Sequence, residues 1–403
     1  MPGPLSGVRI ADFTWAWAGP NATLLLGMMG AEIVKIESMR RPDHTRVRSL
    51  AAGPTAQDID KSFIFNDLNY DKLSATLNLQ QPKAVELAKR IIALSDVVVE
   101  NFRPGVMERL GLGYEALRAV KPDIIMLSSS ACGAYGPERR YVGYAPTFSA
   151  QGGLAYLTGY EDGPPNTLTG SIDLRSATFS AFAIVAALNC RALTGRGQFI
   201  DLSSQECMSM LAGDAFLEYG MTGRIPTRHG NRDEAMAPHN CYPCAGDDAW
   251  ISIAVANDDE WRALAHVIGE PEWTHDPRFQ DAYGRLRHQE ELDRFVAGWT
   301  RQHTAFEAME LLQAVGVAAV PSFTAKDLHE DTHLKERQFT ATVEHPTMGK
   351  KVVIGAPFKF SATPTSVEKP GPLIGQHNSY VFGELLGLSP QEIETLAAEE
   401  VIC

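Results

Sequence analysis

In the first third of the chain, short apolar runs alternate with segments whose apolar residues recur at helical spacing. The segment 82–95, PKAVELAKRIIALS, is the clearest example of the helical pattern. The apolar runs that predict buried strands are 8–13, 31–37, 74–79, 96–101 and 123–130. Because strands that alternate with helices need crossover connections, the pattern predicts a Rossmann-like α/β domain with a mainly parallel sheet.

The pattern changes after about residue 220. Segment 221–240 is polar and irregular, and the residues after it mix a strand-like run with helical patterns, which predicts a smaller α+β domain. Segment 343–361 then reads as a strand pair and 380–401 as a helix pair. We therefore expect three parts: 1–220 as the first part of the large domain, 221–325 as linker and small domain, and 326–403 as a return to the large domain with C-terminal helices.

One carboxylate stands before a long run of small and apolar residues in segment 167–188, TLTGSIDLRSATFSAFAIVAAL. The run after Asp173 predicts a buried helix. An aspartate at a helix start can accept backbone N–H bonds and is favoured by the helix dipole. This stretch by itself leaves open whether Asp173 is only a cap or has a chemical role.

Composition narrows the range of partners. The formal net charge of −13 argues against nucleic acid and anionic membranes as general partners. The N-terminal residues lack the basic and apolar regions of a signal peptide, and no uninterrupted apolar run approaches the ~20 residues of a membrane span. We therefore expect a cytoplasmic protein with no membrane partner. The six cysteines are scattered, and the pair Cys241 and Cys244 lacks a second ligand pair, so we expect no metal site.

Several nucleotide and hydrolase motifs are missing from the sequence. No G-x-G-x-x-G follows the first predicted strand, and there is no Walker-A loop, G-x-S-x-G or H-E-x-x-H. These absences argue against nicotinamide, ATP and serine-hydrolase chemistry.

Eight segments together carry a resemblance to a known family. In order they are PLSGVRIADFT, GAEIVKIE, LNYDKLSATLNL, DVVVENFRPGVMERLGLGYEAL, GSIDLRSATFSAFAIVAAL, LTGRGQFIDLSSQE, HPTMGK and LIGQHNSYVFGELLGLSPQEI. On these segments the chain resembles the class III CoA-transferase family, which contains formyl-CoA transferase, carnitine CoA-transferase and α-methylacyl-CoA racemase. The resemblance implies a CoA-transferase enzyme (EC 2.8.3 type) that moves CoA from an acyl-CoA donor, such as succinyl-CoA, to an organic acid.

In that family the aspartate of the small-residue helix is the nucleophile, and the resemblance implies this role for Asp173. The carboxylate attacks the thioester, and the chemistry proceeds through a mixed anhydride to an aspartyl-CoA thioester. Coenzyme A and acyl-CoA are then substrates, and no tightly bound cofactor is expected.

The resemblance also implies the residues that contact CoA. They are Ala16, Lys72, Asn101, Arg103 and Arg109. Formyl-CoA transferase has an arginine directly after the glutamate of the second strand, whereas this chain has Ser38 there. We expect Arg40 or Arg41 to take that place.

The acid substrate is suggested by the first loop, TWAWAGP. Trp15 and Trp17 would line the acyl pocket with indole rings, together with Tyr144, and this favours a bulky or aryl-substituted carboxylate. Both tryptophans could instead be core residues. The TWAWAGP and RPD details are similar to a branch of the family that transfers CoA from succinyl-CoA to benzylsuccinate.

Two alternatives to a transferase remain. A racemase or epimerase on the same fold needs a histidine near Tyr144, and there is no histidine between His44 and His229. A non-catalytic partner subunit of a hetero-oligomeric transferase would have no need to keep Asp173. The resemblance implies an interlocked homodimer, and a heterodimer with a sibling subunit is also possible.

Overall fold

The computed structural model describes residues 3–48 and 58–403, which divide into two compact units. The larger unit comprises the segments up to Ala155, Thr167–Ile225 and His333–Cys403. The smaller unit comprises Tyr156–Asn166 and Pro226–Thr332. The chain therefore leaves the larger unit twice and returns twice, whereas the sequence pattern indicated only the second excursion.

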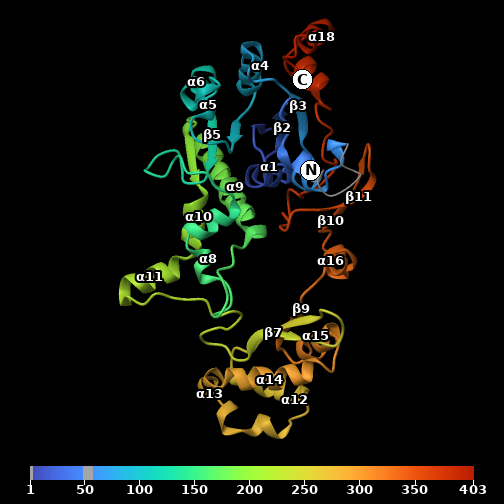
Figure 1. Ribbon diagram of the computed structural model, residues 1–403. Helices are drawn as coiled ribbons and strands as arrows, with labels where there is room; N and C mark the ends of the chain where they lie inside the picture. Colours follow the sequence, from blue (N-terminus) through green and yellow to red (C-terminus); the bar gives the residue numbers. More distant parts are fainter. Residues whose placement is uncertain (1–2, 49–57) are drawn as a thin grey trace. The chain divides into compact units, whose positions relative to one another are not determined.

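A six-stranded parallel sheet forms the centre of the larger unit (Figure 1). The strands are β1 (Arg9–Asp12), β2 (Glu32–Glu37), β3 (Leu73–Thr76), β4 (Val97–Glu100), β5 (Ile125–Ser130) and β6 (Phe199–Ser203). Their order is β3-β2-β1-β4-β5-β6, so the chain starts in the middle and winds outward in both directions. This confirms the predicted Rossmann-like α/β fold with a parallel sheet.

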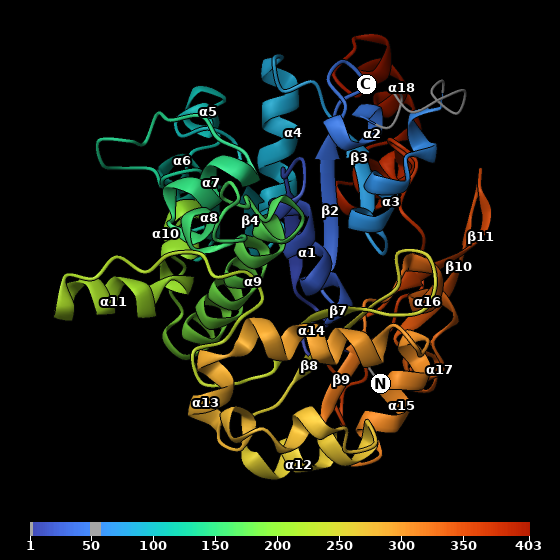
Figure 2. The ribbon, with the colours of Figure 1, turned by 60° about the horizontal axis from the view of Figure 1, so that its bottom comes forward.

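Helices cover both faces of the sheet (Figure 2). On one face, α1 (Ala18–Met28) and α9 (Thr169–Thr194) pack on alternate strand residues such as Ile10, Val97 and Ile125. On the other face, Ala11, Val34 and Val98 pack with α4 (Pro82–Ala93), α6 (Tyr114–Val120), helix η6 (Ser379–Leu385) and α18 (Pro390–Ala398). Successive strand residues point to opposite faces of a sheet. The continuous apolar runs of these strands therefore make both faces of the sheet apolar.

The other elements of the larger unit lie in its connections. The connecting helices are α2 (His44–Arg48), η3 (Ile59–Lys61), α3 (Phe63–Asn69), α5 (Val106–Arg109), α7 (Ala145–Gln151), α8 (Leu154–Leu157), α10 (Ser204–Leu211), α11 (Gly213–Thr222) and α17 (Thr332–Glu336). Helices α8 and α17 lie at the boundaries of the unit. An antiparallel pair, β10 (Thr340–His345) and β11 (Gly349–Ile354), agrees with the strand pair expected there.

The smaller unit is an α+β structure, as the sequence predicts. Its antiparallel sheet has the order β7 (His239–Pro243), β8 (Trp250–Ala254) and β9 (Ala318–Pro321). The helices are α12 (Asp258–Val267), η4 (Glu272–His275), η5 (Pro277–Phe279), α13 (Ala282–Arg287), α14 (Gln289–Thr300), α15 (Ala305–Gln313) and α16 (Ala325–Glu330). The sheet packs on α12, α14 and α15 around an apolar core that includes Trp261 and Phe279.

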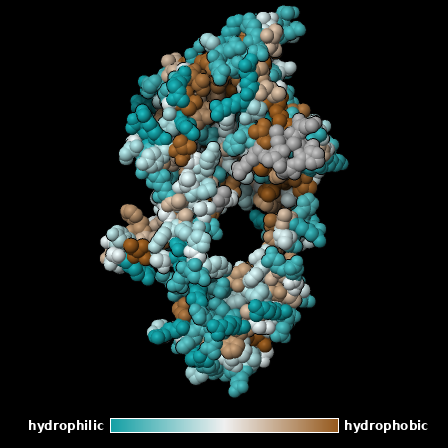
Figure 3. Space-filling view, viewed as in Figure 1, coloured by the Kyte–Doolittle hydropathy of each residue, from teal (hydrophilic) through white to brown (hydrophobic). Residues whose placement is uncertain are grey.

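Helices α9 and α11 expose apolar side chains. Within the described part of the chain, the α9 segment Gly170–Thr194 is the one helix that by length and composition could cross a membrane. One side of α9 packs on α1 and the sheet, but Phe182 and Leu193 are exposed, so the helix is not buried all round as the sequence suggested. On α11, Phe216 and Met221 are also exposed, and Figure 3 shows hydrophobic residues on the surface there.

Candidate active site

Asp173 lies inside α9 and not at its start. The helix begins at Thr169, after Leu168, whose backbone is left-handed with φ of 50° and which makes no side-chain cap bond. Asp173 is therefore the fifth residue of the helix, one turn beyond the position where a side chain caps backbone N–H groups. The cap interpretation of Asp173 is wrong.

The Asp173 carboxylate is half-buried and has no hydrogen-bond or ion-pair partner among residues 3–48 and 58–403. Burial raises the pKa of Asp173 to about 6. A carboxylate withdrawn from water without a partner destabilises a fold, and such groups are concentrated at functional sites. At neutral pH the group is still mainly ionised, and its oxygens are free to attack.

The loop after β1 is held in place by an amide clamp. Asn101 accepts the backbone N–H of Trp15 at 2.8 Å and donates to the carbonyl of Trp15 at 2.7 Å. The next residue, Ala16, has a left-handed backbone with φ of 65°, and its N–H donates to Asp43 at 3.3 Å. The predicted residues Trp15, Ala16 and Asn101 are thus brought together at the carboxyl edge of the sheet.

Below this loop lies a buried network of ion pairs. Lys35 donates to the carbonyl of Thr14 at 2.7 Å and pairs with Asp43 at 3.2 Å. Asp12 accepts from the backbone N–H and the hydroxyl of Thr14. Because these charged groups are fully buried and mutually satisfied, they fix the loop that carries both tryptophans.

The Lys72 side chain is buried within this network and does not lie at the surface. Its ammonium group donates to Asp12, Thr23, Asn69 and the carbonyl of Pro20, at 2.8 to 3.2 Å. Burial lowers the pKa of Lys72 to about 8, against the attraction of Asp12. A fully buried cation that already has four partners is not available to a phosphate group, and this argues against the CoA contact expected for Lys72.

The two arginines after β2 have different surroundings. Arg40 forms an ion pair with Glu400 in the C-terminal segment. The Arg41 guanidinium lies over the Trp15 ring, 4.8 Å from its centroid, and Trp15 packs edge-to-face on Phe102. Of these two arginines, Arg41 is therefore the one that lies at the first loop.

A cavity of about 610 Å³ lies beside β4 and β5 and gathers four arginines. They are Arg103, Arg109, Arg139 and Arg140. The predicted residues Arg103 and Arg109 thus share one cavity, whereas the sequence reasoning missed Arg139 and Arg140. Both follow an irregular segment that Asp201 holds by accepting the N–H of Ala134 at 2.9 and 3.0 Å. Convergent guanidinium groups suit a ligand with several phosphates.

The proposed acid-binding residues lie at the starts of helices that pack on α9. Trp17 is half-buried directly before α1, and Tyr144, which is 71% exposed, directly precedes α7. Helix α9 packs on both α1 and α7. Asp173, Trp17 and Tyr144 are not part of the lining of the arginine cavity as the described residues define it.

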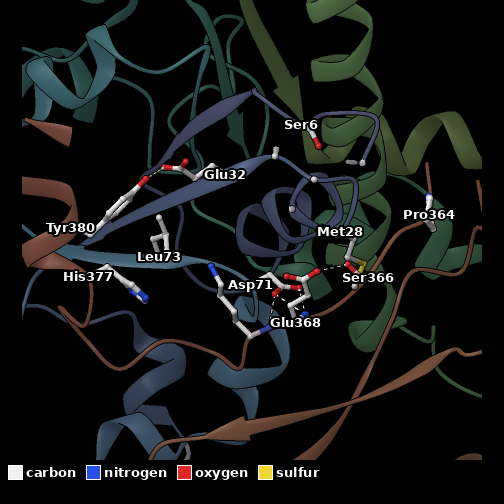
Figure 4. Close-up of a pocket in the computed structure, with 15 residues that line it drawn as sticks. Ser6, Met28, Glu32, Asp71, Leu73, Pro364, Ser366, Glu368, His377 and Tyr380 are labelled. Atoms are coloured by element: carbon white, nitrogen blue, oxygen red, sulfur yellow. Dashed lines mark hydrogen bonds between the residues drawn. The ribbon is translucent and has the colours of Figure 1, made fainter. Parts of the chain in front are cut away.

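A second cavity, of about 670 Å³, lies at the amino ends of β2 and β3 (Figure 4). Its carboxylates are already engaged: Glu32 pairs with Arg9, and Asp71 accepts the backbone N–H groups of Glu368 and Lys369. Ligands of open α/β sheets bind at the carboxyl ends of the strands, which is the opposite edge. The arginine cavity is therefore the stronger candidate for a polyanionic ligand. No group of three or more possible metal ligands occurs among the residues described.

Comparison with known proteins agrees with this fold. The model of CoA-transferase family III matches residues 5–378, and the chain belongs to this family. It is 37% identical to succinyl-CoA–D-citramalate CoA-transferase of Chloroflexus aurantiacus over 100% of this chain and 98% of that protein. It is 32% identical to the beta subunit of succinyl-CoA–L-malate CoA-transferase of the same organism, over 99% and 98%. A CaiB/BaiF family protein of Brucella suis superposes with a TM-score of 0.85 at 28% identity, covering 96% of this chain and 100% of that structure.

These relatives are transferases that use CoA thioesters, and the chain is accordingly a class III CoA-transferase.

Proposed function

We propose that this enzyme moves CoA from an acyl-CoA donor, such as succinyl-CoA, to an organic acid through a thioester formed on Asp173. The observation that carries the proposal is the state of the Asp173 carboxylate, which is half-buried, has no partner among the residues that the structure describes and is mainly ionised at neutral pH. An ionised carboxylate is a competent nucleophile toward a thioester without an additional base.

The reaction proceeds in two symmetrical halves. An Asp173 oxygen attacks the acyl carbonyl, the C–S bond breaks, and the CoA thiolate leaves behind a mixed anhydride. The thiolate then attacks the Asp173 carbonyl carbon, and the bond between that carbon and the bridging oxygen of the anhydride breaks. The donor acid leaves with this oxygen, so that an aspartyl-CoA thioester remains. The acceptor carboxylate reverses both steps and leaves with CoA, which conserves the energy of the thioester.

The arginine cavity supplies the site for the CoA nucleotide. Arg103, Arg109, Arg139 and Arg140 provide bidentate donors for its phosphates. Arg41 on the Trp15 ring and the clamped loop Trp15–Ala16 border the same edge of the sheet. Trp17 and Tyr144 would then contact the acid, which supports a bulky or aryl-substituted carboxylate as acceptor.

Intact-protein mass spectrometry after incubation with succinyl-CoA alone tests the covalent step. Addition of a CoA group at Asp173, removed by hydroxylamine, is the expected result. A panel of acceptor acids with succinyl-CoA as donor then identifies the acid. Absence of any hydroxylamine-labile adduct with every acyl-CoA offered would contradict the mechanism.

The exposed apolar surfaces of α9 and α11 support a dimer, as the family resemblance implies. Phe216 on α11 is 83% exposed and Met221 is 75% exposed, which is unusual for side chains that face only water. A second copy of this chain is the proposed cover, and a sibling subunit is the alternative, because one relative is named as a beta subunit.

A further inference from the structure

Glu100 is an unexplained acidic group on the arginine cavity. It is the last residue of β4, it lines the cavity, and its side chain is buried, with only 5% exposed. The cavity contains one other lining carboxylate, Glu108, which is exposed. Although four arginines line the same space, Glu100 forms no ion pair within the described residues.

The contacts of Glu100 hold the turn that follows β4. Its Oε2 atom accepts the backbone N–H of Phe102 at 2.7 Å, and its side chain is hydrogen-bonded with that of Ser128 on β5. The same turn carries Asn101, which clamps Trp15, and Arg103, which lines the cavity. Because Glu100 holds this turn, it helps to position both the first loop, through Asn101, and the cavity residue Arg103.

The charged surroundings of Glu100 are mixed in sign. Glu108 on α5 and Asp201 on β6 add negative charge, and Arg103, Arg109, Arg139 and Arg140 line the cavity with positive charge. Burial raises the pKa of Glu100 to about 7, against the hydrogen bonds from Ser128 and Phe102, and the two neighbouring carboxylates raise it further. At neutral pH the group is therefore poised between its neutral and ionised forms.

We propose that Glu100 is a positioning residue that takes up one proton from solvent when the phosphates of the CoA nucleotide enter the arginine cavity. This inference rests on the proposed CoA site. An ionised carboxylate at the wall of the cavity repels an entering phosphate, and the burial of Glu100 weakens the screening of this repulsion by solvent. The neutral carboxyl group removes this repulsion and has an O–H that can donate to a phosphate oxygen.

The pH dependence of binding then has a defined sign. Above pH 7 each bound nucleotide requires protonation of Glu100, so affinity falls as pH rises. Ionisation of the phosphate itself has the opposite effect, because its second pKa is about 6 and added negative charge favours binding to arginines that stay charged. A loss of affinity above neutral pH can therefore be attributed to ionisation of Glu100 and not to ionisation of the phosphate.

Titration calorimetry with adenosine 3′,5′-bisphosphate tests this, since this nucleotide lacks the thiol of CoA, which is a further titratable group. Binding to the full-length protein is measured from pH 6.5 to 8.5 in two buffers of different ionisation enthalpy. We expect proton uptake that approaches one per nucleotide at high pH, and an affinity loss on the order of tenfold, the effect of one pKa unit. Glu100→Gln should abolish both effects, whereas the control variant Glu115→Gln, at an exposed carboxylate on α6 outside the cavity lining, should retain both.

Ser128→Ala provides a second test that leaves Glu100 in place. Loss of the hydrogen bond from Ser128 should move the midpoint of proton uptake to higher pH. Nucleotide binding without proton uptake in the wild type, or uptake that persists in Glu100→Gln, would overturn the proposed role of Glu100. Neither result would contradict the proposed CoA site. Failure of the nucleotide to bind, or unchanged affinity in Arg109→Ala, would instead overturn the proposed CoA site together with it.

Discussion

Asp12 and Asp173 are both withdrawn from water, but the fold treats the two carboxylates in opposite ways. Burial alone would raise the pKa of Asp12, but Lys72, Lys35 and the hydroxyls of Thr14 and Thr23 outweigh it and lower that pKa. Asp173 receives no such compensation from the residues that the structure describes, and burial raises its pKa to about 6. A structural carboxylate is satisfied by partners, and a nucleophile must keep its lone pairs free.

Asp173→Asn should abolish the covalent adduct with succinyl-CoA and reduce transfer by several orders of magnitude, because in the proposed mechanism Asp173 alone performs the covalent step. The variant should nevertheless fold, since Asn and Asp have similar helix propensities. Mass spectrometry and turnover measure the first effect, and circular dichroism measures the second. Near-wild-type turnover in a folded variant would remove Asp173 from the mechanism.

The same substitution should stabilise the protein at high pH. The folded-state pKa of Asp173, about 6, exceeds its reference value of 3.8, so the stability associated with the protonated carboxyl group is lost as pH rises through 6. At pH 8, Asp173→Asn should therefore gain roughly 1–3 kcal/mol, one to two pKa units at about 1.4 kcal/mol each, and this gain should shrink toward zero near pH 4. Thermal melts of both proteins at pH 4, 6 and 8 measure the difference. An equal difference at all three pH values would contradict the assigned pKa.

The pH profile of acylation follows from the same group. In the proposed mechanism only the ionised form of Asp173 attacks the thioester, so the rate of adduct formation at saturating succinyl-CoA should rise through pH 6 and level off near pH 7. Quenched-flow mass spectrometry from pH 5 to 7.5 records this rate. A rate that is constant over the whole range would show that ionisation of Asp173 does not control the step.

At the scale of elements, periodicity in the sequence was enough to find most of the sheet but not the positions of the functional groups. Five of the six strands were visible as apolar runs, and β6 was missed because Phe199–Ser203 alternates polar and apolar residues only briefly. The start of α9 was missed because Leu168 gives no capping signal. Burial of Lys72 depends on Asp12, sixty positions away in the sequence, and spacing alone carries no information about such a contact.

The loops at the carboxyl edge provide a matched pair of substitutions. Arg41 lies on the Trp15 ring, whereas Arg40 pairs with Glu400. Arg41→Ala should raise the KM for succinyl-CoA by about tenfold or more, because loss of a charge-assisted contact costs roughly 1.5–3 kcal/mol. Arg40→Ala should remain near wild type. Equal effects of the two substitutions on steady-state kinetics would show that Arg41 has no special place at the site.

Trp17 tests the contribution of the first loop to the acid pocket. Trp17→Gln should lower kcat/KM for a bulky or aryl acceptor by about 5- to 150-fold, because loss of an aromatic contact is worth on the order of 1–3 kcal/mol. The KM for succinyl-CoA should change little. Kinetics with a small and a bulky acceptor acid measure the selectivity. An unchanged ratio between the two acids would return Trp17 to a purely structural role.

For the whole molecule, the exposed apolar faces of α9 and α11 are the feature that the isolated chain leaves unexplained. An apolar helix face is normally stabilised by burial, and the side chains of Phe216, Leu217 and Met221 gain no such burial within the described residues. Association of two copies would cover these side chains and remove them from water. Interlocked chains would also separate slowly, since dissociation would require partial unfolding.

The full-length protein should therefore elute as a dimer at micromolar concentration and exchange subunits slowly. Phe216→Asp places a charge on the exposed face of α11 and should weaken the dimer, whereas Tyr283→Asp, at a similarly exposed ring on α13 of the smaller unit, should not. Light scattering gives the mass of each variant, and mixing of isotopically labelled and unlabelled protein followed by native mass spectrometry gives the exchange rate. A stable wild-type monomer would exclude the dimer, and a wild-type dimer that both substitutions leave intact would place the interface away from α11.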